Sequence, residues 1–221
     1  MNIRIQLLVL LLFVSIFNSA CAAEQPETKP SSVPSTLQTI EAAAEDIIDF
    51  APSGNRDKIS GDVADIENAW KSYQPQASKD GASQEIQKAM ISALSELQTA
   101  LSAKNPAATM QASNNVSAAV VELFALYNPK VPADIGRLNV LERQVILDVA
   151  AKNYTAATTS LAKTKSVWKE VKSSVLEHAG RNVAAEFEAS LTIQESALND
   201  KDGTALTSEA SNGLGIVDKM E

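Results

Sequence analysis

Residues 59–73, ISGDVADIENAWKSY, recur in outline 98 positions further along the chain. The same ungapped shift superposes Trp70-Lys71 on Trp168-Lys169. The sequence contains only two tryptophans, and both fall in this register. Self-similarity at a fixed spacing is typical of a structural unit that is used more than once. The sequence therefore predicts one unit that occurs twice.

The composition favours helices. Hydrophobic residues make up 45% and charged residues 21% of the 221 residues, which is ordinary for a packed globular protein. Aromatic residues reach only 5%, and alanine is abundant. Alanine is the best helix former, whereas strands prefer β-branched and aromatic residues. We therefore expect an all-α fold.

Apolar residues recur at spacings of three and four, which is the rhythm of one helix face. The matching stripes around the two tryptophans are Val63, Ile66, Trp70 and Tyr73 in the first half, and Leu161, Thr164, Trp168 and Val171 in the second. Because Trp70 and Trp168 occupy the same position on this stripe, each is expected to anchor the core of its own unit.

The segment 128–132, Asn-Pro-Lys-Val-Pro, divides the chain, because two prolines in four residues cannot continue a helix. We place the first four-helix unit at 36–128 and the second at 133–221. Ser35 is expected to cap the first helix, and Asn105-Pro106 is expected to begin the fourth. Since short loops make neighbouring helices antiparallel, the prediction is two tandem up-down four-helix bundles related by an internal repeat of 98 residues.

The first residues have the three-part pattern of a secretory signal, which we place at 1–20. Arg4 supplies the positive charge, an apolar run follows, and small residues complete the pattern. Residues 21–35 contain three prolines and few apolar side chains, which indicates a flexible tether. One interpretation of the signal at 1–20 is that it is removed by ordinary cleavage after small residues, which would release a soluble protein.

The end of the signal, Ser19-Ala20-Cys21, resembles a bacterial lipobox, although Asn18 stands where that motif usually has an aliphatic residue. The resemblance implies lipidation of Cys21 and a membrane-anchored protein of the bacterial cell envelope. Cys21 is the only cysteine, so it has no partner for an intramolecular disulfide. Its position directly after the apolar run is where lipidation would give this thiol a role.

The charge of the chain excludes some partners. Removing residues 1–20 takes away only Arg4, which leaves 18 Lys plus Arg against 27 Asp plus Glu, a net charge of −9. That sign disfavours nucleic acid and a basic membrane-binding surface. The expected contact with the membrane is therefore the N-terminal lipid alone, and an envelope protein is a possible partner.

No set of residues predicts catalysis or a cofactor. His178 is the single histidine, so no site with two imidazoles can form. Asp200-Lys201-Asp202-Gly203 resembles the centre of an EF-hand loop, but Leu198 would stand where the first ligand is needed. The row Glu41, Glu45 and Asp49 could collect a cation, although such a row is more often a solvated helix flank. We assign no catalytic, cofactor or metal residue.

The function predicted is a non-catalytic, exported, lipid-anchored helical-repeat protein that binds a protein or a small ligand. Two alternatives stay open, namely an acidic metal-binding or metal-buffering bundle and an enzyme with a carboxylate or Ser/Lys site. The retained polar residues Lys71, Lys169, Asn114 and Asn212 are the candidate surface contacts. The two asparagines lie well round the helix from the apolar stripe, so they are expected to be exposed and to belong either to the contact between the halves or to a partner surface.

We predict that Cys21→Ser abolishes lipidation and removes the processed protein from the membrane fraction. The mass of the processed wild-type protein should exceed that of its polypeptide, and fractionation with mass spectrometry measures both effects. If the variant fractionates like the wild type and its processed mass is unchanged, the lipoprotein interpretation is wrong and ordinary cleavage after small residues is preferred.

Overall fold

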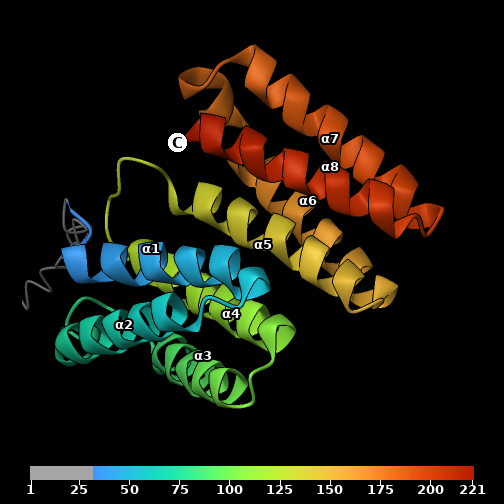
Figure 1. Cartoon of the computed structure of the whole chain (residues 1–221). Helices are drawn as coiled ribbons and strands as arrows, with labels where there is room; N and C mark the ends of the chain where they lie inside the picture. The colour runs from blue at the N-terminus through green and yellow to red at the C-terminus, as the bar shows by residue number, and fades with distance from the viewer. Residues whose placement is uncertain (1–31) are drawn as a thin grey trace, which may run out of the picture.

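The computed structural model describes residues 32–221, and within them it contains eight α-helices and no strand (Figure 1). The all-α expectation is thus confirmed for this range. The helices are α1 Ser35–Phe50, α2 Arg56–Ala77, α3 Gln84–Ser102, α4 Pro106–Phe124, α5 Ala133–Ala150, α6 Tyr154–His178, α7 Arg181–Asn199 and α8 Gly203–Val217. Short 3-10 turns follow α1 and α8. The signal, Cys21 and the tether up to residue 31 lie outside the described residues.

Three of the turns between helices have the same construction. Lys104, Lys152 and Lys201 adopt positive φ angles of 56°, 57° and 54°. Each lysine precedes a residue whose side chain accepts a hydrogen bond from the backbone three positions later, namely Asn105, Asn153 and Asp202. A left-handed residue ends one helix and an N-cap begins the next, which reverses the chain within a few residues. The expected cap at Asn105 is confirmed.

One expected helix boundary differs from the structure. The first helix begins at Ser35 itself, and Pro34 stands at the N-cap position without a side-chain hydrogen bond. The Pro34 carbonyl already accepts from the amides of Leu37 and Gln38, so the helical hydrogen bonds start one residue earlier than expected. Pro75 lies inside the last turn of α2, which continues to Ala77.

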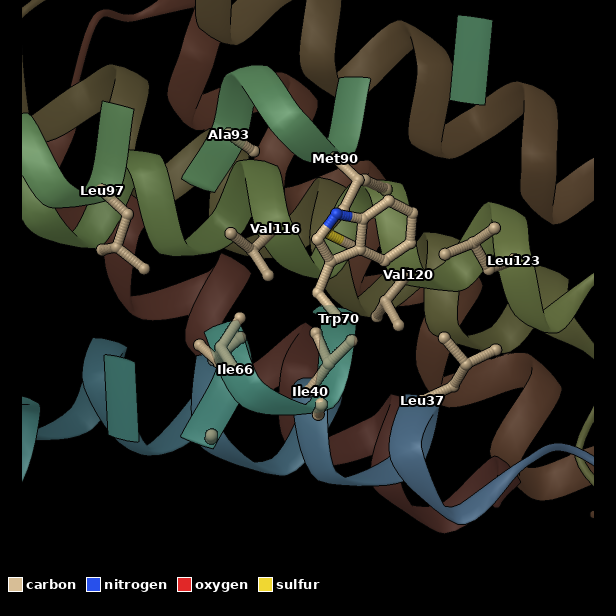
Figure 2. Packing of buried hydrophobic residues seen from close by; sticks show 14 of the residues in the cluster. Leu37, Ile40, Ile66, Trp70, Met90, Ala93, Leu97, Val116, Val120 and Leu123 are labelled. Atoms are coloured by element: carbon tan, nitrogen blue, oxygen red, sulfur yellow. The ribbon is translucent and has the colours of Figure 1, made fainter. Parts of the chain in front are cut away.

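Buried apolar residues form two clusters, one among α1–α4 and one among α5–α8. Figure 2 shows Trp70 in the first cluster, surrounded by Ile40, Ile66, Met90 and Val116 from all four helices of that group. In the second cluster the ring of Trp168 packs 4.9 Å from that of Phe187. Both tryptophans are only 5% exposed, so each lies in the core of its own helix group.

A polar contact between α4 and α5 joins the two groups, and we call it the α4–α5 seam. The side chain of Asn114, only 1% exposed, donates to the Val140 carbonyl at 3.2 Å and to Gln144 Oε1 at 3.0 Å. Gln111 and Gln144 exchange two hydrogen bonds, of 2.8 and 3.0 Å. Arg137 on α5 holds both oxygens of Glu122 on α4 at 2.8 Å. These paired groups fix how one helix group sits on the other.

The second core contains a buried acid. Glu142 on α5 is 0% exposed, and Gln194 on α7 donates to its Oε2 at 2.9 Å. Burial raises the pKa of Glu142 to about 8, with a further increase from Glu209 and an opposing effect of Gln194. Gly213 on α8 makes room for this carboxyl, because a Cβ there would lie 2.9 to 3.2 Å from its atoms.

We predict opposite effects for two glycine substitutions on α8. Gly213→Ala should lower the free energy of unfolding by about 1–3 kcal/mol, because the new methyl group overpacks the buried Glu142 carboxyl. Gly215→Ala is the matched control, since nothing lies within 4 Å of its added Cβ. That variant should gain up to about 1 kcal/mol from the better helix propensity of alanine. Denaturant unfolding measures both, and equal effects at the two positions would contradict the packing argument.

Candidate functional site

A cavity of about 530 Å³ lies where the two helix groups meet, and we call it the junction cavity. Its walls come from α1, α5, the end of α4, the loop that follows α4, and Glu221. In Figure 1 this loop passes close to the beginning of α1, at the end of the molecule where the chain also finishes. The residues that line it are Ser32, Val33, Gln38, Glu41, Ala42, Glu45, Val121, Phe124, Pro129, Lys130, Val131, Pro132, Ala133, Gly136, Asn139 and Glu221.

Two lining residues have buried acceptors without partners among residues 32–221. Asn139 on α5 is 7% exposed, and its Oδ1 receives no hydrogen bond. The Oε2 of Glu41 on α1 is also buried and unpaired. Ser117 on α4 faces Glu41, and its hydroxyl is close enough to oppose the rise of the Glu41 pKa. A buried acceptor left unpaired costs about 1–3 kcal/mol. A ligand that donates hydrogen bonds to these groups would remove this cost.

The Glu41 carboxyl has a raised pKa, because it is buried and lies near other carboxyl groups. Its pKa is raised to about 8, mainly by burial and then by the neighbouring charges of Glu45 and Glu221, while Arg143 and Ser117 act in the opposite direction. The side chain is thus largely neutral at pH 7. A neutral carboxyl can donate a proton or accept a hydrogen bond, and a nearby cation would favour its ionised form.

An ion pair crosses the junction beside the cavity. Arg143 Nη2 on α5 donates to Glu45 Oε1 on α1 at 2.6 Å. The second guanidinium nitrogen of Arg143, Nη1, is buried without a partner among the described residues. Glu221 approaches the same group of charges, and burial first and then Glu45 raise its pKa. Carboxyl groups outnumber cationic groups around the cavity.

The residues singled out from the sequence lie elsewhere. Trp70 and Trp168 are in the two cores, and Trp168 Nε1 donates to Glu188 Oε1 at 3.4 Å. Lys71 and Lys169 are exposed on α2 and α6. The structure does not bring the two Trp-Lys pairs together in one site, since each pair belongs to a different helix group.

The two asparagines expected on the surface have different environments. Asn114 is buried in the α4–α5 seam, so it is not exposed as expected, but it lies at the contact between the helix groups, which was one of the two roles expected of it. Asn212 is exposed on α8, where it donates to Glu209 Oε1 at 2.9 Å. The reason is positional, because α5 packs over the side of α4 that carries Asn114, whereas Asn212 lies on a side of α8 that no described helix covers.

The structure separates the row of acids on α1. Glu41 is turned into the cavity, Glu45 is paired with Arg143, and Asp49 is exposed. Asp202, from the segment that resembles an EF-hand, accepts from the Ala205 amide as the N-cap of α8. Among residues 32–221 no group of three or more His, Cys, Asp or Glu side chains could hold a metal ion.

The cavity residue Asn139 and the neighbouring Arg143 were not singled out as site residues in the sequence, although a signal for them exists. They lie 98 positions after Glu41 and Glu45, and the ion pair joins two residues at that same separation. Corresponding positions of the two halves therefore face one another at the junction. Glu221 has no such signal, because only the path of the chain after α8 brings it to the cavity.

Comparison of the chain with protein families, with curated proteins and with solved structures finds no match. Within the part of the chain that the structure describes, every helix is too short or too polar to cross a membrane.

We predict that the stability of the protein falls as pH rises from about 4.5 to about 8. In this window native Glu41 keeps the proton that the unfolded chain has lost, so each pH unit costs about 1.4 kcal/mol. Glu41→Gln should remove the part of this slope that Glu41 contributes and make the variant more stable than wild type toward pH 8. Denaturant unfolding at several pH values measures the effect.

Glu142→Gln is the comparison variant, because its carboxyl is buried in the other helix group with a pKa also raised to about 8. Each substitution should remove a similar share of the pH dependence, and the double variant should remove both shares. A pH dependence that is the same in wild type and in Glu41→Gln would contradict the assignment of a neutral Glu41.

Proposed function

We propose that this chain is a non-catalytic, exported protein of the bacterial cell envelope, anchored by a lipid on Cys21, whose junction cavity binds a small ligand. Residues 36–128 and 133–221 would be the two four-helix units of a tandem repeat. The observation that carries the proposal is the junction cavity, where apolar walls surround the unpaired acceptors of Glu41 and Asn139.

The repeat is supported by the two separate apolar clusters and by the pairing of Glu45 with Arg143 at a separation of 98 residues. If equivalent helices of two similar units pack near one another, equivalent residues can meet at the contact between them. A ligand site at such a contact needs both units in place. The proposal therefore makes docking of the units a condition for binding.

A small ligand is favoured over a protein partner by the shape and chemistry of the site. A volume of about 530 Å³ lies in the range of about 300–1,000 Å³ that is typical of small-molecule sites. Such sites have mostly apolar walls with a few polar groups that orient the ligand. Val121, Phe124 and Val131 supply the walls here, and Glu41 and Asn139 supply the polar groups.

The cavity also has a defined relation to the proposed anchor. Ser32 and Val33 line it, and only 11 residues separate Ser32 from Cys21. An extended segment of that length spans at most roughly 40 Å. Lipidation of Cys21 would thus hold the cavity near the membrane surface. The lipid is the proposed membrane contact, an envelope protein stays a possible partner, and no nucleic acid partner is proposed.

A neutral fluorophore tests the binding function. Prodan should bind in a single site, with a shift of its emission to shorter wavelength that reports an apolar surrounding. Ala42, an exposed residue of α1 that lines the cavity, offers a place to block it. Ala42→Phe should weaken binding by at least about tenfold, because the aromatic ring takes up space that the probe needs.

Ala64→Phe is the matched control, since Ala64 is exposed on α2 and does not line the cavity. It should bind prodan like the wild type. Equal binding by both variants, or no saturable binding by the wild-type protein, would overturn the proposal of a ligand site in this cavity.

A further inference from the structure

The polar groups in the junction cavity need hydrogen-bond donors. Both Glu41 Oε2 and Asn139 Oδ1 are buried acceptors without a partner among the described residues. They come from α1 and α5, so they approach the cavity from opposite helix groups. A ligand with several donors on one atom can satisfy acceptors on both walls, and an ammonium group carries three.

The charges around the cavity also favour a cationic ligand. Three carboxyl side chains line it, namely those of Glu41, Glu45 and Glu221. The cationic side chains nearby are Lys130, which is exposed, and Arg143, which is committed to Glu45 at 2.6 Å. The like charges of Glu45 and Glu221 oppose ionisation of Glu41. A cationic ligand would relieve this repulsion, whereas an anionic ligand would add to it.

The remaining walls require an apolar ligand body. Val33, Val121, Phe124 and Val131 line the cavity together with Pro129 and Pro132. An ammonium group on its own would leave these side chains without contacts. The site therefore suits a molecule with an apolar part and one cationic end.

We propose that the junction cavity binds a small amphipathic amine, whose ammonium group donates hydrogen bonds to Glu41 Oε2 and Asn139 Oδ1 while its apolar body contacts Val121 and Phe124. This inference rests on the proposed small-ligand function and names the chemical class of the ligand. The bound ammonium pairs with ionised Glu41, so the proton that Glu41 holds in the free protein is released on binding.

Three probes of equal chain length test the proposal, namely 1-octylamine, 1-octanol and octanoate. Displacement of prodan and isothermal titration calorimetry measure their affinities. The amine should bind at least about tenfold more tightly than the alcohol, because it makes a charge-assisted hydrogen bond that the alcohol lacks. Octanoate should bind most weakly. Glu41→Gln should bring the amine to within about threefold of the alcohol and leave the affinity for the alcohol unchanged.

Proton release gives a second measurement that does not depend on the variant. Titrations at pH 6.5 in buffers with different ionisation enthalpies should show release of up to about one proton for each amine bound, and none for octanol. The charged and polar groups that face Glu41 are Glu45 on α1, Ser117 on α4, Arg143 and Asn139 on α5, and Glu221. Glu41→Gln should abolish the release.

Glu170→Gln, which changes an exposed acid on α6 outside the cavity, is the control and should bind all three probes like the wild type. Saturable binding of octanol without a preference for the amine would overturn this inference and leave the small-ligand function standing. An amine preference that survives Glu41→Gln would also overturn it, because the ammonium group would then lie elsewhere. Failure of all three probes to bind would count against the small-ligand function itself.

Discussion

The contact between α4 and α5 is the interaction on which the rest of the junction depends. Its central side chain is the Asn114 amide, which is removed from water and bonded to Val140 and Gln144 of the other helix group. A buried NH2 group without acceptors would cost more than the contact gains, so the seam is stable only in a register that supplies these two acceptors, while Asn114 Oδ1 stays unpaired among the described residues. This requirement fixes α5 relative to α1, and thereby brings Arg143 to Glu45 and creates the walls of the cavity.

The junction contains polar groups that the fold does not satisfy. Glu41 and Asn139 each have a buried oxygen without a partner among the described residues, and Arg143 has a buried nitrogen in the same condition. Most buried polar atoms in proteins are paired, so such a concentration in one place lowers stability. Proteins tolerate this kind of local cost mainly at functional sites. The second core shows the same feature on a smaller scale, because Gln194 donates to Glu142 Oε2 while Glu142 Oε1 and Gln194 Oε1 are buried without partners among the described residues.

Similar positions in the two halves have acquired different roles because their surroundings differ. Trp70 and Trp168 both lie in apolar cores, where each indole meets helices of its own group. Asn114 and Asn212 show the opposite outcome, since α5 covers the first and leaves the second exposed. The same offset of 98 residues relates Glu41 to Asn139 across the cavity and Glu45 to Arg143 across the ion pair. Residues 98 positions apart therefore carry complementary groups at the junction.

Local signals in the sequence determined the helical class, the apolar stripes and most turns. Asn105 begins a helix, Asn128 to Pro132 interrupts one, and the stripe through Trp70 turns inward, because each depends on neighbours within a few residues. The predicted N-cap at Ser35 was wrong by one residue, since Pro34 stands at that position. The burial of Asn114, Glu41 and Glu142 was decided by the tertiary structure alone. Helical periodicity identifies the apolar face of a helix, but which part of its polar flank becomes covered depends on the docking of helices far apart in the chain.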